Sequence, residues 1–240
     1  MNGILLIDKP KGWTSFDVVA KVRGVLKKEL ATRNSPLETP SRKVKVGHTG
    51  TLDPLATGLL VILLGNYTKR APELTKLDKV YEVTMKLGQT STTGDDEGDK
   101  TTISSEKPAL AELKVAIKSF EGEIEQVPPA FSAVKVNGQR AYKLARAGKE
   151  VKIEPRQVKI YKITDIKYTY PTTTFTVHVS SGTYIRSLTT DIGEKLGTGA
   201  YMSDLRRTRV GEFDISNATN MDNIDSESVY KNLRPIDKTP

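Results

Sequence analysis

The hydrophobic pattern changes from a strand period to a helix period within the first thirty residues. Residues 4–8, four apolar residues followed by Asp8, precede a Lys-Pro-Lys-Gly turn and predict a short strand. A Thr-Ser pair that can cap a helix follows, and apolar residues then recur near helical spacing. These are Phe16, Val19, Val22 and Leu26. The polar segment 31–42 contains two prolines and is predicted to be an exposed loop.

The middle of the chain reads as strands joined by loops. Residues 59–64 are a short apolar run between glycines, which predicts a strand buried on both faces. A short helix is predicted over 68–77. Residues 80–88 alternate apolar and polar side chains, as in a half-buried strand. The acidic segment 92–99 is expected to be a solvated surface loop, because it lacks the pattern of a calcium-binding loop.

The second half predicts a helix that ends at Gly122, strands over 157–168 and 174–180, and a helix that ends at Gly197. Strands and helices are therefore interspersed, and hairpin signals favour antiparallel pairing. We expect an α+β fold with a mixed, mainly antiparallel central sheet and flanking helices.

Residues 127–152 differ in composition from their surroundings. A Pro-Pro pair opens the segment, and Asn137-Gly138 indicates a hairpin turn. Six bases oppose the single acid Glu150. They are Lys135, Arg140, Lys143, Arg146, Lys149 and Lys152.

Charge and composition limit the function classes. The chain has 240 residues and a net charge of +8, and residues 212–240 are acidic on balance, with six acids against three bases. A basic body favours a polyanionic partner such as nucleic acid. No apolar run is long enough to span a membrane, and the sequence enters a strand at once without a secretory leader, so a cytoplasmic protein is expected.

The residue inventory also limits the chemistry. There is no cysteine, and the only histidines are His48 and His178. Thiol nucleophiles and thiolate or multi-histidine metal sites are therefore not expected. No dinucleotide-binding or phosphate-loop motif is visible. We predict chemistry without a cofactor or metal.

The most informative segment is 47–58, Gly-His-Thr-Gly-Thr-Leu-Asp-Pro-Leu-Ala-Thr-Gly, in which Asp53 is the only acid. Pro54 disfavours helical backbone at Asp53, and glycines allow sharp bends. By itself, such an acid is either a turn former or a reactive group.

Four further motifs accompany this segment: residues 3–15, Lys79-Val80-Tyr81, Ser181-Gly182-Thr183-Tyr184-Ile185-Arg186 and Leu205-Arg206-Arg207. Together, and in this order over residues 3–211, they resemble the TruB family of tRNA pseudouridine synthases. The resemblance implies the pseudouridine synthase fold. It also implies conversion of uridine 55 in the TΨC loop of tRNA to pseudouridine, by a stand-alone, cofactor-free enzyme that flips the base out of its stack.

The same resemblance assigns roles to residues. Asp53 is the catalytic carboxylate, which either attacks C1′ or removes a sugar proton, and Arg186 is its partner. Tyr81 stacks on the uracil and could help to remove the C5 proton. Tyr184 and Leu205 line the pocket, although core packing would also explain these two and Tyr81. His48 contacts the RNA; the alternative is a loop histidine bonded only to the backbone. For Arg186 the alternative is a surface arginine at the start of a helix.

Lys9 and the six bases of residues 135–152 would contact phosphates. Residues 127–152 would be a mobile insertion that closes over the T-loop; the alternative is a generic basic hairpin. The implied domains are a catalytic domain, 1–211, and a short acidic extension, 212–240, too short for the RNA-binding PUA domain usual in the family. The expected partner is the T-arm of tRNA, bound by a monomer without guide RNA or membrane.

Three alternatives remain open. A non-catalytic tRNA-binding or folding chaperone on the same scaffold would use the same charges and aromatic rings. A guide-RNA-dependent synthase is a second possibility. A glycoside hydrolase is the third, but it normally needs two carboxylates and Asp53 has no acidic neighbour in sequence.

Overall fold

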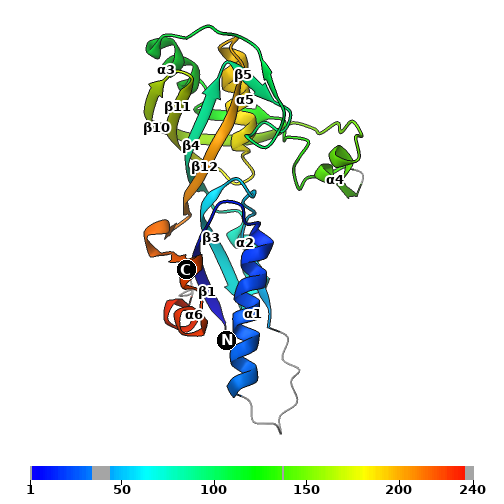
Figure 1. Ribbon diagram of the computed structural model, residues 1–240, viewed down its shortest axis with the longest axis vertical. Helices are drawn as coiled ribbons and strands as arrows, with labels where there is room; N and C mark the ends of the chain where they lie inside the picture. The colour runs from blue at the N-terminus through cyan, green and yellow to red at the C-terminus, as the bar shows by residue number, and fades with distance from the viewer. Residues whose placement is uncertain (1, 34–43, 137, 236–240) are drawn as a thin grey trace. The chain divides into compact units, whose positions relative to one another are not determined.

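The computed structural model describes residues 2–136 and 138–235, apart from 34–43. The chain divides into two compact units (Figure 1). The terminal unit comprises Met1–Lys79 together with Arg206–Pro240, and the central unit comprises Val80–Leu205.

The sheet of the terminal unit is built around two apolar strands, β1 and β3, which pair antiparallel. On the other side of β3, β2 pairs antiparallel, and residues 206 and 207 of β12 pair parallel. Two short strands complete the sheet: β14 pairs parallel with β1, and β13 pairs antiparallel with β12. The strands are β1 (Gly3–Lys9), β2 (Val46–His48), β3 (Thr57–Leu64), β12 (Ala200–Val210), β13 (Phe213–Asp214) and β14 (Thr219–Asn220).

Both faces of β1 and β3 are covered by apolar side chains. Leu5 and Ile62 belong to one cluster, and Leu6 and Val61 to the other. This confirms the prediction that 59–64 is a strand buried on both faces. Helix α1 (Ser15–Arg33) covers the first face, as Figure 1 shows, through Val18, Val19, Val22 and Leu26.

Three details of this unit differ from the predictions. Phe16 does not belong to the buried face of α1, because Val18 takes that place. Residues 31–33 of the predicted 31–42 loop belong to α1 instead. The rest of that segment lies outside the described residues. The helix predicted over 68–77 is a 3-10 helix, η1 (Gly65–Arg70), followed by one turn, α2 (Ala71–Leu74). The remaining helices of the unit are η2 (Ile215–Asn217), η3 (Met221–Asn223) and α6 (Ser226–Asn232).

In the central unit the strand order is β12-β4-β11-β10-β7. Strand β10 pairs antiparallel with both β11 and β7. The strands of this sheet are β4 (Lys79–Leu87), β7 (Gly122–Gln126), β10 (Arg156–Thr169) and β11 (Thr172–Val179). Two separate hairpins are formed by β5 (Gln89–Ser91) and β6 (Lys100–Thr102), and by β8 (Lys135–Val136) and β9 (Gln139–Arg140). The helices are α3 (Leu110–Lys118), α4 (Ala141–Arg146) and α5 (Ile185–Lys195).

The predicted strands and helices of the central unit are confirmed, and so is the α+β class with a mixed, mainly antiparallel sheet. Strand β7 and the β5–β6 hairpin were not predicted, and two further points were not foreseen. The basic segment contains helix α4 after its hairpin, whose Asn137 lies outside the described residues. The 92–99 segment is not wholly solvated, because the side chain of Asp95 is buried.

Candidate active site

Asp53 lies in a loop, residues 49–56, that joins β2 to β3. Residues of the N-terminal motif form hydrogen bonds with this loop. The Ser15 hydroxyl accepts a hydrogen bond from the Leu52 amide at 2.8 Å and donates to the Leu52 carbonyl at 3.1 Å. The Gly12 amide donates to the Pro54 carbonyl at 2.8 Å. The residues before and after Asp53 are therefore both fixed. We call residues 49–56 the Asp53 loop.

Lys9 supports the same loop from within. Its side chain is fully buried, and its ammonium group donates to the carbonyl oxygens of Pro10 at 2.9 Å, Trp13 at 2.6 Å and Pro54 at 3.5 Å. Burial lowers the pKa of Lys9 to about 8, while the negative charge of Asp53 acts in the opposite direction. The two charges therefore interact. The predicted phosphate contact of Lys9 stays a prediction.

Arg207 anchors the loop to the sheet. Its guanidinium is buried and donates to the carbonyls of Leu59 at 2.8 Å and Gly50 at 3.1 Å. Gly58 pairs with Arg207 across the strands at a φ of +101°, and a Cβ there would lie 2.3 Å from the Arg207 carbonyl oxygen. Only glycine fits this close approach.

His48 ends β2, directly before the Asp53 loop, and is half-buried. Burial and the positive charge of Arg207 lower its pKa below the ordinary value of 6.5, which favours the neutral imidazole at pH 7. Within the part of the chain that the structure describes, its Nδ1 atom is buried and has no hydrogen-bond partner.

In the central unit, Arg186 is a buried cation in the first turn of α5. It donates to the carbonyls of Phe131 at 2.7 Å and Thr93 at 3.1 Å, and its guanidinium lies 3.4 Å from the carboxylate of Asp95. Both side chains of this ion pair are less than a tenth exposed. Arg186 is therefore a buried residue and not a surface arginine.

The three predicted pocket residues of the central unit lie on a strand or directly before a helix. Tyr81 is buried on β4, and Leu205 is buried on β12. Tyr184 precedes α5, and the side-chain amide of Gln126 holds both its backbone N–H, at 2.7 Å, and its carbonyl, at 3.0 Å. The burial of Tyr81 and Leu205 is compatible with either a pocket or a core role.

The structure thus brings Lys9, His48 and Asp53 together in the terminal unit, and it places Tyr81, Tyr184, Arg186 and Leu205 in the central unit. Sequence reasoning missed Asp95 and Arg207. Asp95 carries no signal that separates it from its acidic neighbours Asp96 and Glu97. Arg207 was part of a quoted motif, but nothing in the sequence indicated its contacts.

The described residues were also searched for metal-binding clusters and membrane-spanning helices. They contain no cluster of three or more acidic or histidine side chains that could hold a metal ion. No helix among them combines the length and hydropathy that a membrane span needs.

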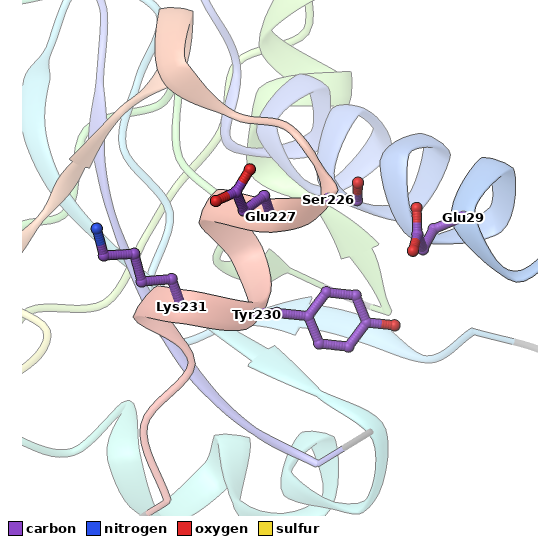
Figure 2. A pocket seen from close by; sticks show the side chains of 5 residues that line it. All are labelled: Glu29, Ser226, Glu227, Tyr230 and Lys231. Carbon is purple, nitrogen blue, oxygen red and sulfur yellow. The ribbon is translucent and has the colours of Figure 1, made fainter.

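A hollow of about 560 Å³ lies between α1 and α6, lined by Glu29, Ser226, Glu227, Tyr230 and Lys231 (Figure 2). It contains no motif residue. Glu29 lies fourteen residues after Ser15 on α1, about 20 Å along the helix axis. The hollow is therefore separate from the Asp53 loop.

Comparison with known proteins agrees with the motifs. Residues 37–185 match the model of the TruB family pseudouridylate synthase N-terminal domain, and residues 186–238 match that of the tRNA pseudouridylate synthase B C-terminal domain. The chain is similar to tRNA pseudouridine synthase B of Clostridium kluyveri (44% identity over 99% of this chain and 77% of that protein) and of Clostridium tetani (43%, 99% and 78%).

Solved structures show the same fold. A chain of a Cbf5-Nop10-Gar1 complex superposes with a TM-score of 0.70 at 31% identity and covers 97% of this chain. A chain of an H/ACA RNP bound to a substrate RNA gives 0.66 at 29% identity and 95% coverage. This chain spans only 60% and 54% of those two chains. The family matches and the relatives together show that the chain belongs to the TruB family of pseudouridylate synthases.

Proposed function

We propose that this chain is an isomerase that converts uridine 55 in the TΨC loop of tRNA to pseudouridine, as a monomer without guide RNA or cofactor. Family membership and the names of the curated relatives support a pseudouridine synthase that acts on tRNA. The observation that carries the proposal is the carboxylate of Asp53 in a loop that two buried side chains hold, Ser15 at Leu52 and Lys9 at Pro54.

The reaction balances without a co-reactant. The N1–C1′ bond of uridine breaks, the uracil turns, and a C5–C1′ bond forms; C5 then loses a proton and N1 ends protonated. Asp53 starts this sequence by attacking C1′ or by removing a sugar proton. A carboxylate can serve either as nucleophile or as base.

The other residues take supporting roles in the proposal. In the proposal Arg186, which also pairs with Asp95, serves as the cationic partner of Asp53. Tyr81 stacks on the extruded uracil, and Tyr184 and Leu205 line the pocket. His48 contacts the RNA as a neutral imidazole. The insertion, residues 127–152, binds tRNA phosphates through its exposed bases, within a catalytic region that spans 1–211.

The test is pseudouridine mapping on an unmodified tRNA transcript by carbodiimide labelling and primer extension. Wild-type protein should give a new stop at position 55, and none on a transcript with cytidine there. Asp53→Asn should lower the rate by at least about 10³-fold while tRNA affinity stays within about threefold. Asp222→Asn, an exposed acid of the same unit, is the matched control and should act like wild type.

Two outcomes contradict the proposal. Retained activity in Asp53→Asn removes the assigned role of the carboxylate. Tight tRNA binding by the wild-type chain without any modification favours the chaperone alternative.

A further inference from the structure

Phe16 is the most exposed aromatic residue in the described part of the chain, with 65% of its surface accessible. It lies in the first turn of α1, outside the buried face of that helix. Single exposed apolar side chains are common and need no explanation by themselves. The exposed ring of Phe16 is informative because of its position, its fixed backbone and the charges near it.

The backbone of Phe16 is fixed beside the Asp53 loop. Its neighbour Ser15 makes both hydrogen bonds to Leu52, the residue before Asp53. Phe16 therefore lies at the edge of the loop that carries the proposed catalytic carboxylate. A side chain at this position can contact a substrate that binds at the Asp53 loop.

A reciprocal cap holds the same turn. The Thr14 amide and hydroxyl donate to the Asp17 carboxylate at 2.8 and 2.7 Å, and the Asp17 amide donates back to the Thr14 hydroxyl at 3.1 Å. This pattern fixes the first turn of a helix. Phe16 thus presents a ring on an ordered backbone, so a contact with it loses little backbone entropy.

The exposed charges around Phe16 favour a polyanion. Exposed lysines lie on the preceding turn and along α1, and the nearest acid, Asp17, is engaged in the cap. The nearest are Lys11, five residues before Phe16, and Lys21, five residues after it; Lys27 and Lys28 lie farther along α1. An exposed aromatic ring among cations suits nucleic acid, whose bases stack on the ring while its phosphates meet the lysines.

We propose that Phe16 stacks on the base of a T-loop nucleotide that neighbours the target uridine in tRNA. This inference rests on the proposed function. Flipping the target base leaves its neighbours without a stacking partner, and the ring of Phe16 replaces that partner. Phe16 acts in binding, and it takes no part in the bond changes.

The first experiment compares tRNA affinity of Phe16→Ala, Phe16→Trp and Leu30→Ala, each in an Asp53→Asn background so that no product forms. Phe16→Ala should raise the dissociation constant about 5- to 100-fold, the range expected for loss of one stacked base. Phe16→Trp should stay within about threefold of the parent. Leu30 is an exposed apolar residue near the far end of α1, and its variant is the matched control.

The second experiment separates stacking from a general structural effect. T-arm substrates with an abasic nucleotide on either side of uridine 55 are bound to the parent and to Phe16→Ala. At the stacked position, removal of the base and removal of the ring should be non-additive, so that the Phe16→Ala effect falls to within about twofold. At the other position the two effects should multiply.

The inference is overturned if Phe16→Ala binds tRNA like the parent, or if its effect is unchanged on both abasic substrates. Failure of the proposed function gives a different pattern. Wild-type protein would then bind tRNA without forming pseudouridine, whatever the result at Phe16.

Discussion

The Asp53 loop and the insertion are built in opposite ways. Three buried side chains bond the Asp53 loop: Ser15 to Leu52, Lys9 to Pro54, and Arg207 to Gly50. The insertion carries six bases that are all exposed. Its helix α4 is short, with Ala141 as its only fully buried residue in the described range.

The difference follows from the tasks proposed for the two regions. Bond rearrangement requires a carboxylate held within a fraction of an ångström, and buried hydrogen bonds provide that precision. Phosphate binding requires charge that is accessible to solvent and RNA, and it tolerates looser geometry. We therefore expect changes in the insertion to alter affinity, and changes around the Asp53 loop to alter stability and turnover.

Among the changes that test this contrast, the largest effect is expected from the insertion. Replacing Lys135, Lys143 and Lys149 with alanine removes three exposed charges, and among the residues that the structure describes their side chains make no hydrogen bond. Affinity for tRNA should fall at least about tenfold at 0.1 M salt, and the slope of log K against log salt should become shallower by about 2. Filter binding over a salt series measures both quantities, and the unfolding midpoint should not change.

The control for this prediction is the alanine variant of Lys76, Lys114 and Lys231, which are exposed lysines outside the insertion. It has the same net charge as the first variant. Equal losses of affinity in the two variants would show that only the overall charge matters and that the insertion has no special role.

A smaller effect is expected from Ser15→Ala, which tests the rigid side of the comparison. The substitution leaves the buried amide of Leu52 without its acceptor, and an unsatisfied buried group costs about 1–3 kcal/mol. Unfolding free energy should fall by that amount, hydrogen exchange of the Leu52 amide should accelerate, and turnover should decrease more than tRNA affinity. Thr75→Ala removes an exposed hydroxyl bond in the same unit and should change stability by less than about 0.5 kcal/mol.

Unchanged exchange at Leu52 in Ser15→Ala would mean that the loop keeps its order without this anchor. The contrast between the two regions would then be weaker than the hydrogen bonds indicate.

Much of the fold was predictable because its signals are local. The apolar run of β3, the alternation along β4 and the cap before α1 each specify an element within about ten residues. The exception at Phe16 is also informative. Its spacing fits the helix period, but which face of α1 is buried depends on the sheet that packs against it, and this places Val18 inside.

The site was predictable only in part. Its motifs indicated Asp53 and Arg186 as candidates, but the groups that contact Arg186 and the Asp53 loop come from distant positions in the chain. Asp95 meets Arg186 from ninety-one residues away, and Arg207 reaches Gly50 across the sheet. Such contacts depend on tertiary structure, and periodicity carries no information about them.

The smallest effect concerns the electrostatics of the Asp53 loop. Arg207→Gln removes the positive charge that helps to lower the pKa of His48, so this pKa should rise toward 6.5. An NMR titration of the ring protons follows it directly, and the resonances of His178, in the central unit, serve as an internal reference. If Arg207→Gln does not fold, the wild-type titration still tests the direction, because the midpoint of His48 should lie below 6.5.

The same shift sets a pH dependence of stability. Because the folded state holds His48 at a lowered pKa, it binds fewer protons than the unfolded chain below pH 6.5, and the unfolding free energy should fall as the pH drops through that value. His48→Gln lacks this titration, so its unfolding free energy should fall less than that of wild type between pH 7.5 and 5.5 in urea melts. Equal falls in both proteins would show that the charge of Arg207 and the burial of His48 leave the loop's stability unaffected, and the Asp53 loop would then owe its order to hydrogen bonds alone.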